Sequence, residues 1–301
     1  MKPTRHLGID LGGTNIKTIV IEHRRPNEPA EVIHSSQTAT LAEAGPDSVA
    51  ENLIEAGRKA RGSIDDITSV GLGVPGLFNE DNGQIELFPN LPGPWKRYPL
   101  RDTVSAGLGI DVSMINDARA FTLAEGTIGA GRNAKVMLGI TLGTGIGGGV
   151  MIDGRLHLGA FGTAGEFGHQ TVDPNGPLCG CGNRGCLEAV ARGEVVANEA
   201  GVSDVRDLYT ALKSGDEAAV AATQRSNMYM AIAISNAVSL LGVDVVVIGG
   251  GVASSGDLVL KPLRRAVDER VTLVPTQDIK IVPASLGPMA GAIGAALVGM
   301  G

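Results

Sequence analysis

All three cysteines of this 301-residue chain lie in one glycine-rich segment, Cys179-Gly-Cys181-Gly-Asn-Arg-Gly-Cys186. A histidine, His169, stands ten residues before the first of them. Three thiolates and an imidazole are the donor set that a closed, tetrahedral Zn²⁺ site accepts. A disulfide framework is a poor alternative, because it normally has an even number of cysteines spread along a short chain. The segment therefore predicts a structural zinc site, in which a carboxylate could replace His169 as the fourth ligand.

Acidic residues flank this segment on both sides. Glu166 comes three residues before His169, and Glu188 comes two residues after Cys186. A zinc site here would hold two carboxylates and an imidazole around a single point.

The composition is that of an ordinary soluble globular protein, with 43% hydrophobic and 19% charged residues. The chain is long for a single core, so two lobes are expected. A net charge of −7 argues against nucleic acid as the main partner, since binding phosphates requires a basic face. The first six residues lead into an apolar strand without a signal-peptide core. Residues 136–152 carry no charge but contain six glycines, and they are fewer than the roughly 20 apolar residues that a membrane span needs. We therefore expect a cytoplasmic protein that does not enter a membrane.

A pattern of strand, glycine turn and strand occurs twice. Strands are predicted over residues 6–10 and 16–21, and again over 136–141 and 146–152, around a Gly-Thr turn in both cases. Two similar hairpins in one chain predict two lobes of like topology with a cleft between them. The other predicted strands lie near 31–36, 69–74, 112–115, 243–248 and 279–282, and the predicted helices span 46–61, 99–108, 117–128, 187–200, 205–213, 216–241, 258–270 and 289–298, with a long loop over 78–98.

Three glycine-rich turns each follow directly after a predicted strand. They are Asp10-Leu-Gly12-Gly13-Thr14-Asn15, Gly143-Thr144-Gly145-Ile-Gly147-Gly148 and Gly249-Gly250-Gly251. Backbone N–H groups in such turns can bind anions, and glycines permit the close approach of phosphates. None of the turns is a Walker A loop or a Rossmann fingerprint. Any one of them alone could be a plain hairpin turn. Three together, two with a threonine and one directly after Asp10, favour a site for nucleotide phosphates.

Asn116 and Asp117 close a predicted strand and open a helix. Both residue types favour a helix N-cap, which is one interpretation. The other is that Asp117 is a general base at the mouth of the cleft, accepting a hydroxyl proton during phosphoryl transfer. The two interpretations are compatible if the backbone caps the helix and the carboxylate points inward.

These segments resemble the ROK family (repressors, uncharacterised reading frames and sugar kinases), within the actin/hexokinase/Hsp70 ATPase fold. The resemblance covers essentially the whole chain and rests on the first glycine turn, on Asn116-Asp117-Ala118, on residues 142–149 and on residues 166–188. It implies a two-lobed α/β fold with duplicated lobes and a central cleft. Residues 1–116 with 288–301 would form the N-terminal lobe, and residues 117–287 the C-terminal lobe that carries the zinc loop.

The resemblance also implies ligands for these segments. Zn²⁺ would be held by His169, Cys179, Cys181 and Cys186. A sugar would be bound by Gly76, Asn90, Asn116, Asp117, Glu166, His169 and Glu188, with Asp117 as the base. ATP would be held by Gly12, Gly13, Thr14, Asn15, Lys17, Thr144, Gly145, Gly250 and Gly251, with Asp10 near Mg²⁺. Arg119 and Phe121 depart from the pattern, because kinase relatives usually have smaller or amide residues there.

The activity implied is an ATP-dependent hexokinase of the glucokinase type, which phosphorylates the 6-hydroxyl of glucose and forms a homodimer or homotetramer. Residues 90–95 resemble the sugar-side loop of glucokinases. Kinases for N-acetylmannosamine, N-acetylglucosamine, allose or fructose are the main alternatives, and polyphosphate or ADP as donor is a further one. A sugar-responsive repressor would need a helix-turn-helix before the first strand, and six residues cannot hold one.

Overall fold

The computed structural model describes residues 3–23, 30–62, 64, 66–89, 91–251 and 256–300. The chain divides into two compact units, one made of Met1–Ala124 and Pro288–Gly301 and the other of Glu125–Gly287. The first boundary lies in α3 (Asp117–Thr127), later in the chain than the expected division after Asn116. The first turns of α3 belong to the first unit because they pack on α9 (Ala290–Gly299), where a Cβ at Gly294 would overlap the backbone oxygen of Ala120.

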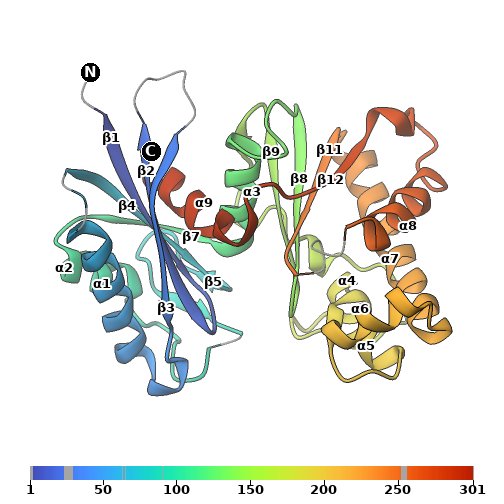
Figure 1. Cartoon of the computed structure of the whole chain (residues 1–301), viewed down its shortest axis with the longest axis horizontal. Helices are drawn as coiled ribbons and strands as arrows, with labels where there is room; N and C mark the ends of the chain where they lie inside the picture. The colour runs from blue at the N-terminus through green and yellow to red at the C-terminus, as the bar shows by residue number, and fades with distance from the viewer. Residues whose placement is uncertain are drawn as a thin grey trace. The chain divides into compact units, whose positions relative to one another are not determined.

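The first unit contains a five-stranded sheet in the order β3-β2-β1-β4-β7 (Figure 1). Strands β1, β2 and β3 are antiparallel neighbours, whereas β4 runs parallel to β1 and β7 parallel to β4. The helices α1 and α2 pack together on one face, and α9 covers the other. The bounds are β1 Thr4–Leu11, β2 Asn15–His23, β3 Glu31–Ala39, β4 Ile67–Val74, β7 Val112–Asn116, α1 Pro46–Gly62 and α2 Leu100–Leu108.

Neighbouring residues of β1 show how the two faces are used, since successive side chains of a strand point to opposite sides. Ile9 lies against Gly57 of α1, whereas a Cβ at Gly8 would overlap the backbone oxygen of Ala292 in α9. Gly71 of β4 is equally close to the backbone of Ala295. The small residues of α9 and these two glycines therefore let the helix lie directly on the backbone of the sheet.

The second unit repeats this arrangement with a sheet in the order β10-β9-β8-β11-β12 (Figure 1). The pair β8 and β9 is antiparallel, and β11 runs parallel to β8 and to β12. Both predicted hairpins are therefore present, and the duplicated α/β topology is confirmed. The bounds are β8 Val136–Leu142, β9 Ile146–Ile152, β10 Arg155–Leu156, β11 Val245–Gly249, β12 Lys280–Pro283, α6 Val205–Ser214, α7 Glu217–Leu241 and α8 Asp257–Asp268.

The helix predicted over residues 187–200 is in fact two helices, α4 (Leu187–Ala191) and α5 (Gly193–Glu199). Arg192 between them is extended, with φ −65° and ψ 152°. Its amide donates to the carbonyl of Glu188, which ends α4, and its own carbonyl accepts from the first turn of α5. The break brings Gly193 against Val205, so that α5 packs on α6. Arginine has a high helix propensity, but Gly193 directly after it is a poor helix former and is the local signal for this break.

In the described residues of the segment predicted as loop, 78–98, the regular structure is the short strand β6 (Ile85–Leu87) and the end of its partner β5 (Leu77–Phe78). No helix in the described part of the chain is both long enough and apolar enough to span a membrane.

Candidate functional site

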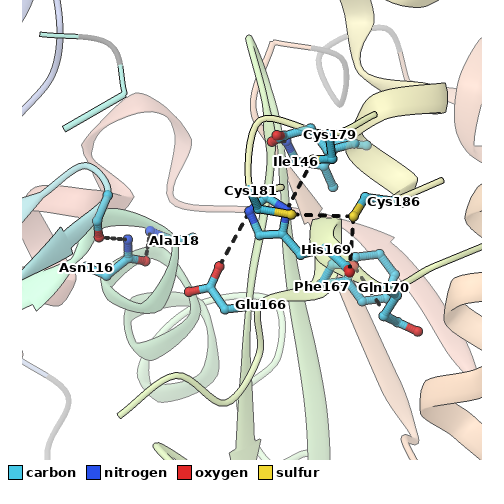
Figure 2. A network of polar contacts seen from close by, with 12 residues as sticks. Asn116, Ala118, Ile146, Glu166, Phe167, His169, Gln170, Cys179, Cys181 and Cys186 are labelled. Carbon is cyan, nitrogen blue, oxygen red and sulfur yellow. Dashed lines mark hydrogen bonds and ion pairs between the residues drawn. The ribbon is translucent and has the colours of Figure 1, made fainter. Parts of the chain in front are cut away.

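The four predicted zinc ligands lie together in the second unit (Figure 2). Their donor atoms are all within 4.8 Å of one another, with Cys179 Sγ 3.6 Å from His169 Nδ1 and Cys181 Sγ 3.7 Å from Cys186 Sγ. A tetrahedral Zn²⁺ with Zn–S bonds of about 2.3 Å separates its sulfurs by roughly 3.8 Å. A disulfide would bring them to about 2.05 Å. The residues present therefore fit one tetrahedral zinc ion, with His169 rather than a carboxylate as the fourth donor.

The thiols of this cluster differ in their acidity. Burial, with the neighbouring thiols, raises the pKa of Cys186 to about 12. The backbone N–H of Asn183 lowers the pKa of Cys181. Thiolates are the form that binds zinc, so a bound cation would have to displace the proton of Cys186. A bound metal ion would supply the positive charge that favours the thiolate form of Cys186.

Both carboxylates that flank the cluster are fixed by its ligands. Glu166 begins the short 3₁₀ turn Phe167–His169, and its Oε2 lies 4.0 Å from Nε2 of His169 (Figure 2). The imidazole thus faces the thiols with one nitrogen and Glu166 with the other. Cys186 directly precedes α4, which carries Glu188 in its first turn. An ion held by His169 and Cys186 would therefore fix the positions of Glu166 and Glu188.

Glu188 also contacts the glycine turn between β8 and β9. The N–H of Ile146 donates to Glu188 Oε2 at 2.8 Å, and a Cβ at Gly145 would overlap the same oxygen. On its other side the turn meets Gly250, which has φ +86° and whose Cβ would overlap the backbone oxygen of Leu142. Two of the three predicted phosphate turns and one predicted sugar ligand are therefore adjacent within the second unit.

A largely apolar cavity opens beside Gly143 and Gly145. Its walls come from α4 to α8, and three polar side chains of α7 line it, of which Ser226 is bonded to a backbone carbonyl and the others are Thr223 and Asn227. Both side chains are at least nine-tenths buried. Thr223 Oγ1 and Asn227 Nδ2 find no hydrogen-bond partner among the described residues. A mostly apolar pocket with a few unsatisfied polar groups is typical of a small-molecule site.

The glycine turn of the first unit connects β1 to β2 and is held in place by Thr40. The Thr40 hydroxyl donates to the carbonyl of Gly12 at 2.6 Å, and its N–H donates to the carbonyl of Thr14 at 2.9 Å. Thr40 was not anticipated from the sequence, because a threonine at the end of a strand gives no local signal.

Asp10 and Lys17 lie opposite each other on β1 and β2. Burial raises the pKa of Asp10, and Lys17 partly offsets this effect. Lys17 Nζ donates to the carbonyl of Pro288 at 2.9 Å. A Cβ at Gly291 would lie 2.8 Å from Asp10 Oδ2, so the start of α9 backs the carboxylate. Gly291 is a second residue that the sequence analysis missed, since it looks like any other small residue of that helix.

At the start of α3 the capping function falls to Asn116, whose Oδ1 accepts from the amides of Ala118 and Arg119 at 3.0 and 3.2 Å (Figure 2). Asn116 Nδ2 donates to the carbonyl of Gly76 at 3.1 Å. Gly76 has φ +80°, and a Cβ there would overlap the carbonyl oxygen of Leu87. The exposed Asp117 shares part of this capping, because its Oδ1 also accepts from the amide of Ala118, at 2.8 Å.

The predicted site residues thus fall into two groups. The cluster, Glu166, Glu188, Thr144, Gly145, Gly250 and Gly251 belong to the second unit, and the residues from Asp10 to Lys17, Gly76, Asn116 and Asp117 belong to the first. Asn90 lies outside the described residues. Arg119 and Phe121 are buried within the fold, so their departure from the pattern concerns packing of α3. The ligand roles of all these residues stay predictions.

Two units with the same strand order, each with a glycine turn after its first strand, define the actin/hexokinase-like ATPase fold. The chain belongs to the ROK family, whose family model matches residues 6–299.

Similar proteins cover almost the whole chain. A glucokinase of Thermotoga maritima is 32% identical, over 99% of this chain and 98% of its own. The crystal structure of a ROK hexokinase from Thermus thermophilus has a TM-score of 0.84 and 34% identity, covering 99% of this chain and 98% of its own. The structure of a ROK family glucokinase from Streptomyces griseus in complex with glucose and AMPPNP has a TM-score of 0.82 and 30% identity, covering 99% of both chains.

The same family includes proteins with other functions. An N-acetylmannosamine kinase of Haemophilus influenzae is 30% identical, over 97% of this chain and 94% of its own. A putative xylose repressor of Caldicellulosiruptor is 32% identical over 96% of this chain, which corresponds to 76% of the repressor.

Proposed function

We propose that this protein is an ATP-dependent hexokinase that transfers the γ-phosphoryl group to the 6-hydroxyl of D-glucose. The observation that carries the proposal is the contact between Glu188 and the turn containing Gly145. A carboxylate suited to sugar hydroxyls lies directly against a turn suited to phosphates. An acceptor and a donor bound at these two places would be neighbours, as group transfer requires.

The acceptor site would use the two carboxylates beside the metal cluster. Carboxylates accept hydrogen bonds from the hydroxyls of a sugar, and charged acceptors make the stronger bonds of this kind. Glu166, Glu188 and His169 would bind hydroxyls of the sugar, and Gly76, Asn90 and Asn116 are the further sugar ligands that we propose. The Streptomyces griseus glucokinase, with glucose and AMPPNP bound, supports this combination of ligands.

The donor site would use the glycine turns and the cavity beside them. The N–H of Gly143 closes the turn on the carbonyl of Gly145, so the phosphates would use the backbone around Thr144, Gly145 and Gly250, where little side-chain bulk permits their approach. The adjacent apolar cavity would take the nucleobase. Thr223 and Asn227, whose polar atoms lack partners there, would bond to its ring edge.

In the transfer step, the sugar hydroxyl oxygen bonds to the γ-phosphorus while the bond from that phosphorus to the β,γ-bridging oxygen breaks. ADP leaves with the bridging oxygen, and the hydroxyl proton passes to the carboxylate of Asp117. The transition state is loose, so the base mainly orients the hydroxyl and takes the proton late. Asp117 can serve in this way because Asn116 Oδ1 also accepts from the amide of Ala118, so the start of the helix does not depend on Asp117 alone.

Two metal ions complete the proposal. Mg²⁺ near Asp10 would screen the charge of the phosphates, and the buried position of this carboxylate suits a cation partner. Zn²⁺ on His169, Cys179, Cys181 and Cys186 would be structural, because four protein ligands leave no open position for chemistry.

A coupled ADP-release assay over a panel of hexoses and N-acetylhexosamines tests the function. We expect the highest kcat/KM with glucose and ATP, and phosphorus NMR of the product should show a phosphate on O6. A higher kcat/KM with N-acetylmannosamine would assign the protein to that branch of the family. Tight sugar binding without turnover of any sugar would contradict the kinase assignment.

A further inference from the structure

The chain passes between the two compact units twice. The first crossing lies between Ala124 and Glu125, and the second between Gly287 and Pro288. Glu125 stands at the first crossing, near the end of α3. Ser285 and Leu286 stand immediately before the second crossing, 160 residues further along the chain.

The carboxylate of Glu125 binds both crossing segments. Its Oε1 accepts from the amides of Ser285 and Leu286 at 2.9 and 2.8 Å. Its Oε2 accepts from the amide of Ala130 at 2.8 Å and from the Ser285 hydroxyl at 3.1 Å. Both oxygens are therefore doubly hydrogen-bonded, and three of the four donors are backbone groups. We call this set of contacts the Glu125 clasp.

The carboxylate at the centre of the clasp is buried. Glu125 has 0% exposure, so its carboxylate oxygens depend on these hydrogen bonds rather than on bulk water. A Cβ at Gly129 would overlap Glu125 Oε2, so only a glycine leaves room for the carboxylate at that position. Glu125 thus supplies the carboxylate of the clasp, and Gly129 leaves the space that this carboxylate occupies.

Each crossing segment is continuous with an element of the proposed site. The helix α3, which ends near Glu125, begins with Asp117, the proposed base. The segment after Leu286 leads into α9, where Gly291 backs the carboxylate of Asp10. A shift at either crossing would therefore be passed along a short helix to a reacting group.

We propose that Glu125 is a positioning residue whose carboxylate joins the two crossings into a single hinge. The clasp keeps the end of α3 from moving independently of the segment that leads into α9, which fixes the direction of the helix that begins with Asp117 during turnover. The catalytic part of this inference rests on the proposed kinase activity, whereas the clasp itself does not.

The test compares three variants of the full chain. Glu125→Gln keeps the shape of the side chain but presents an NH₂ group to one set of donors. Gly129→Ala leaves the glutamate at position 125 unchanged, but the added methyl group would displace its carboxylate. Ser285→Ala is the matched control, because it removes one hydroxyl and leaves both backbone amides bonded.

Hydrogen exchange reports on the clasp without any activity. The amides of Ala130, Ser285 and Leu286 should be protected in the wild type and should exchange at least about tenfold faster, all three together, in Glu125→Gln and Gly129→Ala. Exchange in Ser285→Ala should stay close to the wild type. If the amide of Ala130 exchanges independently of the other two, or if all three are unprotected in the wild type, the clasp is overturned. The wild-type measurement decides this even if a variant fails to fold.

Steady-state kinetics, measured well below the melting temperature of each variant, reports on positioning. We expect kcat to fall at least about tenfold in Glu125→Gln and Gly129→Ala, with the KM for hexose within about threefold, because the metal cluster and Glu188 are untouched. A lower melting temperature with unchanged kcat would overturn the positioning role and leave only a structural one. An inactive wild type would refute the proposed function and, with it, the positioning role, while the exchange data would still decide the clasp.

Discussion

Glu188 and Gly145 are in direct contact: a Cβ at position 145 would overlap the oxygen of Glu188 that already accepts the amide of Ile146. By contrast, a Cβ at Gly143, at the start of the same turn, would meet no described atom within 4 Å. Gly145 therefore leaves the space that the Glu188 carboxylate occupies, whereas Gly143 does not border it. Substitutions at the two positions can therefore test the binding of sugar and the binding of phosphates separately.

Gly145→Ala should displace Glu188 and raise the KM for hexose about tenfold or more, the cost of weakening a hydrogen bond to a charged group. Gly143→Ala should raise the KM for ATP and leave the KM for hexose unchanged, because its methyl group would only obstruct phosphates. Initial-rate kinetics with both substrates varied distinguishes the two effects. An unchanged KM for hexose in Gly145→Ala would remove Glu188 from the sugar site.

Asp117→Asn should lower kcat at least about 100-fold, the lower end of what a positioned base contributes, while sugar binding stays within about tenfold. The fold should persist, because Asn116 caps α3 and an asparagine at position 117 keeps the oxygen that accepts from the amide of Ala118. Calorimetric sugar binding and kcat at saturating substrates are the measurements. A variant that keeps more than a tenth of the wild-type kcat would place the base elsewhere.

Asn116→Ala should lower the stability of the folded protein. It removes the cap and the bond to Gly76, so the free energy of unfolding should fall by about 0.5–2 kcal/mol or somewhat more. Denaturant unfolding measures this, with Asp117→Asn as the control that should change little. Equal losses in the two variants would mean that the cap is shared.

Purified protein should contain about one Zn²⁺ per chain, and Cys181→Ala should lower its stability by several kcal/mol. Cys181 is the exposed cysteine of the three, so its removal leaves little cavity and the loss reports on the metal. A chelator should destabilise the wild type and have little further effect on the variant. Unchanged melting and full activity of metal-free protein would contradict a structural zinc ion.

The pH dependence of stability should reflect Asp10. Burial raises its pKa in the folded state above the ordinary 3.8, so the folded protein binds this proton more tightly than the unfolded chain. Ionising Asp10 therefore costs stability, and the loss develops as pH rises from the unfolded pKa through the folded one. Without Mg²⁺ and nucleotide, Asp10→Asn should melt above the wild type at pH 7, and the difference should disappear near pH 3.

The control for this experiment is Asp81→Asn, at an exposed position, which should change melting little at either pH. Magnesium with ATP should stabilise the wild type more than Asp10→Asn. If Asp10→Asn melts below the wild type at pH 7 without ligands, the carboxylate is stabilised by contacts other than a bound cation.

The parts of the fold that could be predicted are those determined by residues close together in the sequence. The hairpin of β8 and β9 follows from an apolar run interrupted by a Gly-Thr turn, and the metal cluster from ligands within 18 residues, Cys186 included. Both depend on neighbours along the chain. The resemblance to the ROK family extended the prediction to site residues that are far apart in the sequence, such as Asp10 and Gly250.

The parts that could not be predicted depend on contacts between distant segments. Thr40 is bonded to a turn 28 residues earlier, and Glu125 to a segment 160 residues later. A threonine in a strand and a glutamate near a helix end have many ordinary roles, so neither type reveals such a partner. The break at Arg192 differs, because Gly193 is a poor helix former and gives a local signal, to which the packing of Gly193 on Val205 adds.

The close fit of α9 onto the first sheet has a consequence for how the protein is made. Gly8 and Gly71 leave β1 and β4 with bare backbone on the face that α9 covers, and α9 is encoded after the whole second unit. On the ribosome, the amino-terminal sheet must therefore wait with one apolar face uncovered while residues 125–287 are translated. The second unit, which is continuous in sequence, can complete its own core first. The emerging chain should accordingly bind chaperones through the uncovered face of β1 and β4 until residues 290–299 leave the exit tunnel.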